Sequence, residues 1–220
     1  MELDFQYIVG QTPLSEEEKE GLLIKSITTR GELDELEQLN IEKAIGWSLN
    51  NKFRRDKILT EEFIKSVHKK MLGDVWKWAG KFRRSEKNIG VDWVKIGVEL
   101  RMLLDDTIFW IDNNTYSPDE IVIRFKHRLV SIHCFPNGNG RHSRIMADII
   151  IESVFGKEVF NWNNSNLVNP DNARKEYIDS IRKADNGIIE PLIEFARKGR
   201  NHSQGLGFHP KANTQPTLGN

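Results

Sequence analysis

The chain has 220 residues, of which 38% are hydrophobic and 29% are charged, a composition typical of a single soluble domain. Its 32 basic residues balance its 32 acidic residues, so charge gives no general reason to expect nucleic-acid or membrane binding. No apolar run approaches the roughly 18 residues of a membrane span, and the first residues lack the pattern of a signal peptide. A single cysteine, Cys134, excludes an internal disulfide and a cysteine-cluster metal site. We therefore expect a cytoplasmic protein with neither nucleic acid nor membrane as a partner.

Helix signals dominate the chain from residue 60 onward. Thr60 followed by two glutamates marks a helix start, and apolar residues then recur at a spacing of four. A similar stripe consists of Leu100, Leu104, Ile108 and Ile111. At 117–120, the sequence Ser-Pro-Asp-Glu combines a capping residue, a proline at the first helical position and the glutamate of a capping box. Further helices are predicted after Gly140 and after Pro170, the last ending at Gly187. Residues 83–98 lack a helical stripe and suit a loop or a short hairpin.

The pattern of a binding site lies in the stretch SIHCFPNGNGRHSR, in which a helix runs into His133 and a new helix leaves near Arg141. Gly138 and Gly140 let the backbone turn sharply and approach a ligand. The amides of the loop and of the first helical turn lack internal partners, and the helix dipole favours an anion there. Arg141 and Arg144 are three residues apart and share one face of the helix. These features predict a phosphate cradle, although similar glycine loops also serve only to turn a chain.

His133 stands at the edge of this predicted cradle. Because an imidazole titrates near neutrality, it can take a proton from a hydroxyl that attacks a phosphate. The Walker loop, Gly-x-x-x-x-Gly-Lys-Ser/Thr, is absent, and no two histidines have the spacing of a zinc hydrolase. His68, His127 and His142 lie beside basic residues, and we interpret them as surface histidines.

Taken whole, the stretch resembles the signature of the Fic (Fic/Doc) family, His-x-Phe-x-(Asp/Glu)-Gly-Asn-Gly-Arg-x-x-Arg. The positions in register are His133, Phe135, Gly138, Asn139, Gly140, Arg141 and Arg144. Within the family, the chain is most similar to the branch called mobile mystery protein B. The resemblance covers about residues 30–198, which divides the chain into an N-terminal extension (1–29), a Fic domain (30–198) and a C-terminal tail (199–220). The tail is rich in glycine, proline, asparagine and glutamine and has little apolar content, so we expect it to be flexible.

The resemblance implies an all-α fold, mostly helical, with a small β-hairpin flap over the motif. It implies transfer of AMP from ATP to a Ser, Thr or Tyr hydroxyl of a target protein, with His133 as the general base. The flap would contain Asn88, Ile89, Gly90 and Val91 and would dock the target segment as an added strand. Trp76 and Trp78 would pack beneath this flap. ATP is then the co-substrate, Mg²⁺ the expected metal and an unidentified protein the target.

The resemblance also assigns the phosphate-binding residues. Backbone amides around Gly138, Asn139 and Gly140 would hold the α- and β-phosphates, and the Asn139 side chain would also contact the α-phosphate. Arg141 would bind phosphate, and Arg144 would reach the terminal phosphate. Phe135 would pack into the core and anchor the loop. Such a site fits phosphoryl-type transfer, which needs positioning and charge neutralisation more than covalent help from the protein.

The sequence departs from the family signature at Asn137, where an acidic residue usually holds Mg²⁺. An amide oxygen can coordinate Mg²⁺ without supplying charge, so three interpretations stay open. The metal binds more weakly and still supports transfer, the nucleotide supplies most of the ligands, or the nucleotide binds without efficient chemistry. A different phosphate-containing group is a further alternative, as is a nucleotide- or protein-binding module with weak or no transfer activity. Cys134 replaces a usual proline and is interpreted as a small buried side chain.

Many Fic proteins carry an inhibitory helix, Ser/Thr-x-x-x-Glu-Gly/Asn, and no clean copy is present here. Thr28 and Glu32 have the spacing but are followed by Leu33, and Glu37 lacks the hydroxyl residue four positions earlier. We interpret both glutamates as ordinary helix residues. Inhibition by a separate small antitoxin-like protein is then the hypothesis, as in a toxin–antitoxin pair.

Overall fold

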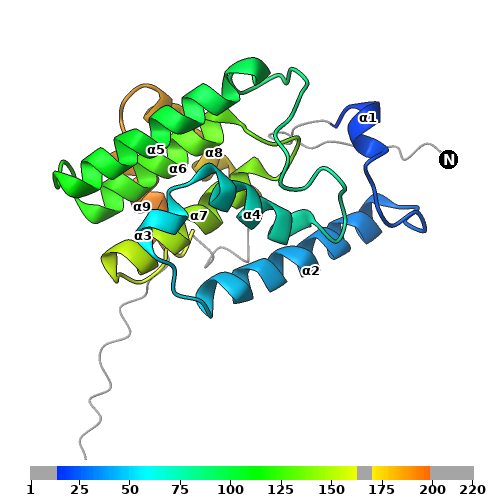
Figure 1. Ribbon diagram of the computed structural model, residues 1–220, viewed down its shortest axis with the longest axis horizontal. Helices are drawn as coiled ribbons and strands as arrows, with labels where there is room; N and C mark the ends of the chain where they lie inside the picture. Colours follow the sequence, from blue (N-terminus) through cyan, green and yellow to red (C-terminus); the bar gives the residue numbers. More distant parts are fainter. Residues whose placement is uncertain (1–13, 163–169, 199–220) are drawn as a thin grey trace, which may run out of the picture.

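A computed structural model describes residues 14–162 and 170–198, and these residues form a mostly helical fold (Figure 1). The α-helices are α1 (Glu16–Lys19), α2 (Arg30–Leu49), α3 (Arg55–Ile58), α4 (Glu61–Leu72), α5 (Ile96–Asp112), α6 (Pro118–Ile132), α7 (Asn139–Phe155), α8 (Pro170–Asp185) and α9 (Glu190–Arg197). A 3-10 turn, η1 (Trp93–Lys95), precedes α5. Within the described ranges there is no β-strand, and no helix is long and apolar enough to cross a membrane.

The helix starts follow the capping signals of the sequence. Thr60 caps α4, its hydroxyl accepting from the Phe63 N–H at 3.2 Å. Ser117 caps α6 in the same way, accepting from the Glu120 N–H at 3.3 Å. The Glu120 carboxylate does not complete the predicted capping box, because it pairs with Arg124 one turn later at 2.7 Å. These starts and the turn at Gly187 after α8, where φ is 86°, confirm the predicted order of helices.

Helix α7 is the central element of the core. It packs against α2, α3, α4 and α6, and Figure 1 shows it between α2 and the paired helices α5 and α6. Met146 and Ile150, which are four residues apart on this helix, are completely buried. Burial of such side chains stabilises the fold by about 1.5–3 kcal/mol each. Because α7 is held from several sides, its N-terminus, which follows the glycine loop, is fixed relative to the rest of the domain.

The described part of the N-terminal extension, residues 14–29, packs on the domain. Leu14 and Ile27 are buried, and an isolated antiparallel bridge joins Leu22 to Trp76. Trp78 donates its indole N–H to the Glu18 carbonyl at 2.9 Å. The two tryptophans stack on each other with ring centroids 4.9 Å apart. They therefore join this segment to the domain. Residues 1–13 and the predicted tail (199–220) lie outside the described residues.

Residues 81–92 form an irregular loop in this structure, without the strand ladder of the expected hairpin flap. The loop is nevertheless attached to the end of α6. The Val91 N–H donates to the Ile132 carbonyl at 3.3 Å, and the Arg83 N–H donates to the Cys134 carbonyl at 2.9 Å. We call residues 84–92 the cover loop. The residue pattern of this stretch suits a loop or a hairpin, and only the family resemblance favoured the hairpin.

Candidate functional site

The glycine loop of the motif is built from two left-handed backbone conformations. Helix α6 ends at His133, which has φ 58° and ψ 57°, and α7 is preceded by Gly138, with φ 77°. A side chain at Gly138 would place its Cβ 2.9 Å from Leu72 Cδ1, so both conformation and space require glycine there. The non-glycine left-handed residue His133 costs of order 1 kcal/mol, which the surrounding contacts offset. The chain thereby brings the imidazole and the N-terminus of α7 to the same loop.

Asn139 holds this loop in shape from inside. Its side-chain oxygen accepts from the Phe135 N–H at 2.9 Å, and its amide nitrogen donates to the Phe135 carbonyl at 2.7 Å. Asn139 is 4% exposed, so both of its polar atoms are used within the loop. The side chain therefore does not face outward toward the position where the resemblance implies an α-phosphate. Its own backbone amide, in the first turn of α7, is the group that remains suited to a phosphate.

His68 of α4, interpreted from sequence as a surface residue, is completely buried against the loop. Its Nδ1 accepts from the Gly80 N–H at 2.9 Å, so its Nε2 carries the proton and donates to the Asn137 carbonyl at 3.0 Å. The ring stacks on Phe135 with centroids 3.7 Å apart. Burial lowers the pKa of His68 well below its usual value, so the imidazole is neutral. The lysines beside His68 in the sequence suggested a surface position. Its spacing of four residues from Ile64 and from Leu72, both buried, was the signal that His68 faces the core.

His142 is also buried, contrary to the sequence interpretation. It is 1% exposed, its Nε2 lies 2.9 Å from the Ile64 carbonyl, and burial lowers its pKa to about 4. Its ring meets Phe135 edge-on at 5.0 Å. Phe135 is itself completely buried and so anchors the loop to the core. His127 is half-buried and bonds Asp185 at 2.8 Å, so it too is not a free surface residue.

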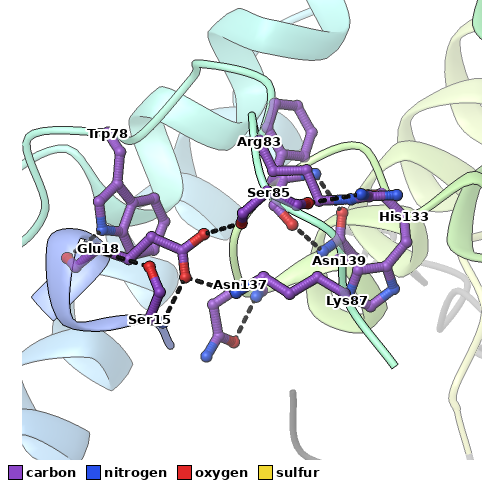
Figure 2. A network of polar contacts seen from close by, with 11 residues as sticks. Ser15, Glu18, Trp78, Arg83, Ser85, Lys87, His133, Asn137 and Asn139 are labelled. Carbon is purple, nitrogen blue, oxygen red and sulfur yellow. Dashed lines mark hydrogen bonds and ion pairs between the residues drawn. The ribbon is translucent and has the colours of Figure 1, made fainter. Parts of the chain in front are cut away.

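His133 is covered in this structure. It is 5% exposed, and a Cβ built on Gly90 of the cover loop would lie 2.7 Å from His133 Cβ. Arg83 donates from Nε to the His133 carbonyl at 2.7 Å and also bonds the Val91 carbonyl, tying the cover loop to the motif (Figure 2). Burial, with Arg83 and Lys87 nearby, lowers the pKa of His133 to about 4. The imidazole is therefore neutral at pH 7, the state in which it can accept a proton.

Arg141 forms an ion pair with a glutamate of α2, which is distant in the sequence. Its Nη2 lies 3.0 Å from Glu37 Oε2, and the other oxygen of Glu37 accepts from the Trp76 indole N–H at 2.7 Å. The Glu37 side chain is 5% exposed. Its interpretation as an ordinary helix glutamate is therefore wrong. Its spacing of four from Leu33 and Ile41, both buried, was the available signal, because it placed Glu37 on the buried face of α2.

Arg144 and Arg141 contact different helices in spite of their shared helix face. Its guanidinium lies 5.5 Å from the ring centroid of Tyr177 in α8. Lys126 of α6 bonds the Tyr177 hydroxyl, and its ammonium is completely buried. Burial, with the charge of Arg144 second, lowers the pKa of Lys126 well below its usual value. Within residues 14–162 and 170–198, no carboxylate lies within ion-pair distance of Arg144, so this arginine is available to an anion.

Asn137, the metal candidate, turns its side-chain oxygen toward its own loop, where it accepts from the Gly138 N–H. Among the described residues, no group of three or more His, Cys, Asp and Glu side chains is arranged to hold a metal ion. A single amide oxygen that already accepts a hydrogen bond is a weak Mg²⁺ ligand. The protein therefore fits Mg²⁺ only where nucleotide phosphates supply most of the oxygens.

Three of the four predicted flap residues are exposed in the cover loop. Asn88 and Gly90 are exposed, Ile89 is 50% exposed and Val91 is half-buried. Around the glycine loop, the space beside Gly140 is open, since a Cβ there would meet no atom within 4 Å. The arrangement thus combines a neutral histidine, a helix N-terminus with open space beside Gly140 and two arginines, a set suited to binding phosphate and accepting a proton.

This arrangement places a glycine loop between two helices of a mostly helical domain, and residues 58–151 match the Fic/DOC family model. Two curated relatives are both called protein adenylyltransferase Fic. The one from Aedes aegypti is 24% identical over 175 residues, covering 78% of this chain and 32% of the relative. The one from Drosophila grimshawi is 26% identical over 141 residues, covering 62% of this chain and 28% of the relative. The chain thus spans about a third of the length of these relatives.

Solved structures share the fold. Fic-1 (residues 134–508) from C. elegans superposes with a TM-score of 0.59 at 20% identity, covering 82% of this chain and 51% of that one. BepC from Bartonella tribocorum, solved with bound AMPPNP, gives a TM-score of 0.61 at 15% identity, covering 83% and 97%. A Bep effector Fic domain from Bartonella quintana, solved with bound ADP, gives 0.59 at 17% identity, covering 79% and 86%. Residues 58–151 therefore match the Fic/DOC family model, and the chain shares the mostly helical fold of these Fic structures.

Proposed function

We propose that this protein is an adenylyltransferase that transfers AMP from ATP to a Ser, Thr or Tyr hydroxyl of a target protein. The single observation that carries the proposal is that His133 and the N-terminus of α7 meet at one glycine loop, where the cover loop lies over a neutral His133 imidazole. The adenylyltransferase names of the curated relatives and the nucleotides in two related structures support the same activity.

In the proposed mechanism, His133 accepts the proton of the target hydroxyl as its oxygen attacks the α-phosphorus of ATP. The new bond joins that oxygen to phosphorus, and the bond to the β-phosphate oxygen breaks, releasing pyrophosphate. Amides of Asn139 and Gly140, and that of Gly138 once it leaves the Asn137 side chain, hold the α- and β-phosphates, because the dipole of α7 favours negative charge at that end. Arg141 and Arg144 neutralise phosphate charge. Arg141 can do so only after it leaves Glu37.

Mg²⁺, where present, would neutralise phosphate charge between the nucleotide and Asn137. The hydrogen bond from the Gly138 N–H to the Asn137 side chain favours weak metal binding. The same observation favours the second candidate function, a Fic domain that binds nucleotide or a protein segment with weak or no transfer. Transfer of another phosphate-containing group belongs to that alternative too.

The proposal also covers the target segment, the mode of inhibition, the family branch and the location of the protein. The cover loop around Asn88–Val91 would dock the target segment by pairing backbone groups, for which its exposure is suited. Glu37 already contacts Arg141, so inhibition from within the chain stands beside the proposal of a small antitoxin-like partner. Placement in the mobile mystery protein B branch, a cytoplasmic location and the absence of nucleic-acid and membrane partners stay predictions.

The test is incubation of the purified chain with α-labelled ATP, Mg²⁺ or Mn²⁺ and a host lysate. The control variant is His133→Ala. Label on protein, lost in the control, is the expected result and establishes transfer of the α-phosphate. Equal labelling by His133→Ala would remove His133 as the base. ATP binding without labelling by either metal would favour the binding module.

An Asn137→Asp variant separates the two candidate functions. If metal binding limits activity, the added carboxylate should increase labelling and shift the Mg²⁺ dependence to lower concentration, because it adds charge to the metal ligand. An unchanged level of labelling in this variant would show that Asn137 does not limit the reaction.

A further inference from the structure

Glu18 of α1 reaches across to the cover loop and forms a nearly buried ion pair with Lys87. The side chains of Lys87 and Glu18 are only 5% and 11% exposed. One carboxylate oxygen of Glu18 accepts from the Ser85 hydroxyl at 3.0 Å, and the other accepts from the Ser15 N–H at 2.8 Å and from Lys87 (Figure 2). Glu18 thus gathers two cover-loop side chains onto a helix that lies outside the Fic/DOC match at 58–151.

Lys87 is the member of this ion pair that lies close to the motif. Its charge acts on the imidazole of His133 and helps to lower its pKa. Figure 2 shows its side chain running from the cover loop beside His133 toward Glu18, across the region drawn with Asn137 and Asn139. The same loop is held to the end of α6 by the Val91 N–H and by Arg83. A cation placed there lies at the edge of the glycine loop that we propose binds phosphates.

Two cations beside this glycine loop are each paired with a glutamate from the N-terminal part of the chain. Glu37 of α2 pairs with Arg141, and Glu18 of α1 pairs with Lys87. A nearly buried lysine without an anionic partner is costly, so the loop needs one negative group at Lys87. A phosphate carries more charge than a carboxylate and forms charge-assisted hydrogen bonds of the same kind. A phosphate could therefore take the place of Glu18.

We propose that Lys87 is a phosphate-binding residue of this site and that Glu18 occupies it until a nucleotide binds. The inference rests on the proposed nucleotide site and adds a residue and a competitor to it. Phosphate would replace the Glu18 carboxylate at the Lys87 ammonium, and the cover loop would then be held by the nucleotide in place of α1. The proposal predicts that ATP and the Glu18 carboxylate compete for the Lys87 ammonium.

The test is calorimetric measurement of ATP, pyrophosphate and adenosine binding to full-chain variants. Glu18→Gln removes the charge but keeps a side chain that can complete the capping box of α1 with Ser15. Lys87→Met removes the cation, and Lys87→Arg keeps it. Glu16→Gln is the matched control, because Glu16 lies on the same helix, pairs only with Lys19 among the described ion pairs and is 77% exposed.

We expect Glu18→Gln to bind ATP and pyrophosphate about tenfold more tightly, the change produced by one charge-assisted contact of about 1.4 kcal/mol. Lys87→Met should bind both about tenfold more weakly, and adding Glu18→Gln to it should give no further gain. Lys87→Arg should bind both more tightly than Lys87→Met, Glu16→Gln should resemble the wild type, and adenosine affinity should not change in any variant.

Three results would overturn the inference. They are a Glu18→Gln gain that survives in the Lys87→Met background, wild-type ATP affinity in Lys87→Met, and equal effects on adenosine and ATP. Thermal unfolding of the same samples would reveal a folding defect in Lys87→Met. In that case the comparison uses Lys87→Arg, which keeps the positive charge: ATP affinity no better than that of Lys87→Met would also overturn the inference. ATP binding with these dependences but without label transfer would remove the proposed activity and leave the role of Lys87 standing.

Discussion

The Arg141 guanidinium donates a hydrogen bond to the Glu37 carboxylate at 3.0 Å, and the two residues are 104 positions apart in the chain. This contact joins the first turn of α7 to the buried face of α2. Trp76 bonds the second oxygen of Glu37, so the carboxylate is held in one orientation. An arginine of the proposed phosphate site is thereby engaged by the protein's own carboxylate.

Glu37→Gln tests this contact. Glutamine can still accept from Trp76, but it removes the ion pair, and Arg141 is 34% exposed and can be hydrated. We expect a loss of about 1 kcal/mol in the free energy of unfolding, measured in urea, together with tighter ATP binding. Glu35→Gln, an exposed change on the same helix, is the control and should alter neither quantity. Unchanged ATP affinity in Glu37→Gln would show that Arg141 does not need release.

Substitution of His68 tests whether the buried imidazole holds the glycine loop. His68→Phe keeps a ring against Phe135 but leaves the Gly80 N–H and the Asn137 carbonyl without their partner. We expect a loss of about 2 kcal/mol in the free energy of unfolding, because unsatisfied buried polar groups cost about 1–3 kcal/mol each. His127→Phe, at a half-buried position, should cost less. If His68→Phe proves as stable as the wild type, these two hydrogen bonds do not support the loop.

A pair of alanine substitutions separates the folding role from the binding role of the glycines. Gly138→Ala should destabilise the protein by about 1–3 kcal/mol, because φ is 77° and the new Cβ would meet Leu72. Gly140→Ala lies in the helix with open space beside it and should be neutral or slightly stabilising. If phosphates approach the backbone here, Gly140→Ala should nevertheless weaken ATP binding. Stable protein with wild-type ATP affinity would place the phosphates elsewhere.

Stability should depend on pH through His133 and His142. Their pKa values are about 4 in the folded state, below the ordinary histidine pKa of 6.5. Between these values the unfolded chain binds more protons, so stability rises with pH by about 1.4 kcal/mol per unit for each histidine and levels off above 6.5. Urea unfolding at several pH values measures the slope, and NMR titration identifies each ring. Titration of His142 near 6.5 would contradict its burial.

Asp148 opposes this trend, and its substitution isolates the opposing contribution. Burial raises its pKa to about 7 from 3.8, although it accepts hydrogen bonds from Phe160 and Trp162. The folded protein binds the extra proton in this window, so Asp148 makes stability fall as pH rises from about 4 to 7. In Asp148→Asn the rise due to the histidines should therefore become steeper. An identical pH profile would show that the carboxyl is not protonated.

Local signals in the sequence determined the helices, their caps and the chemical motif. Thr60 and Ser117 cap helices through contacts within one turn. Gly138 adopts a left-handed conformation where the loop turns into α7. Such interactions involve neighbours in sequence, so their residue types are readable directly. The resemblance based on the motif predicted the Fic fold, and the comparisons confirm it.

Only the tertiary structure decided what the polar residues of the site contact. Glu37 reaches Arg141, Glu18 reaches Lys87, and His68 reaches Asn137, each across more than sixty positions of the chain. Whether a charged or imidazole side chain faces water or a distant partner depends on which helices pack together, and no short sequence window contains both partners. The cover loop is similar: its lack of strand pairing reflects contacts with α1 and the end of α6. Composition and spacing thus determined the chemistry available to this protein, while helix packing determined which of its charges are already occupied.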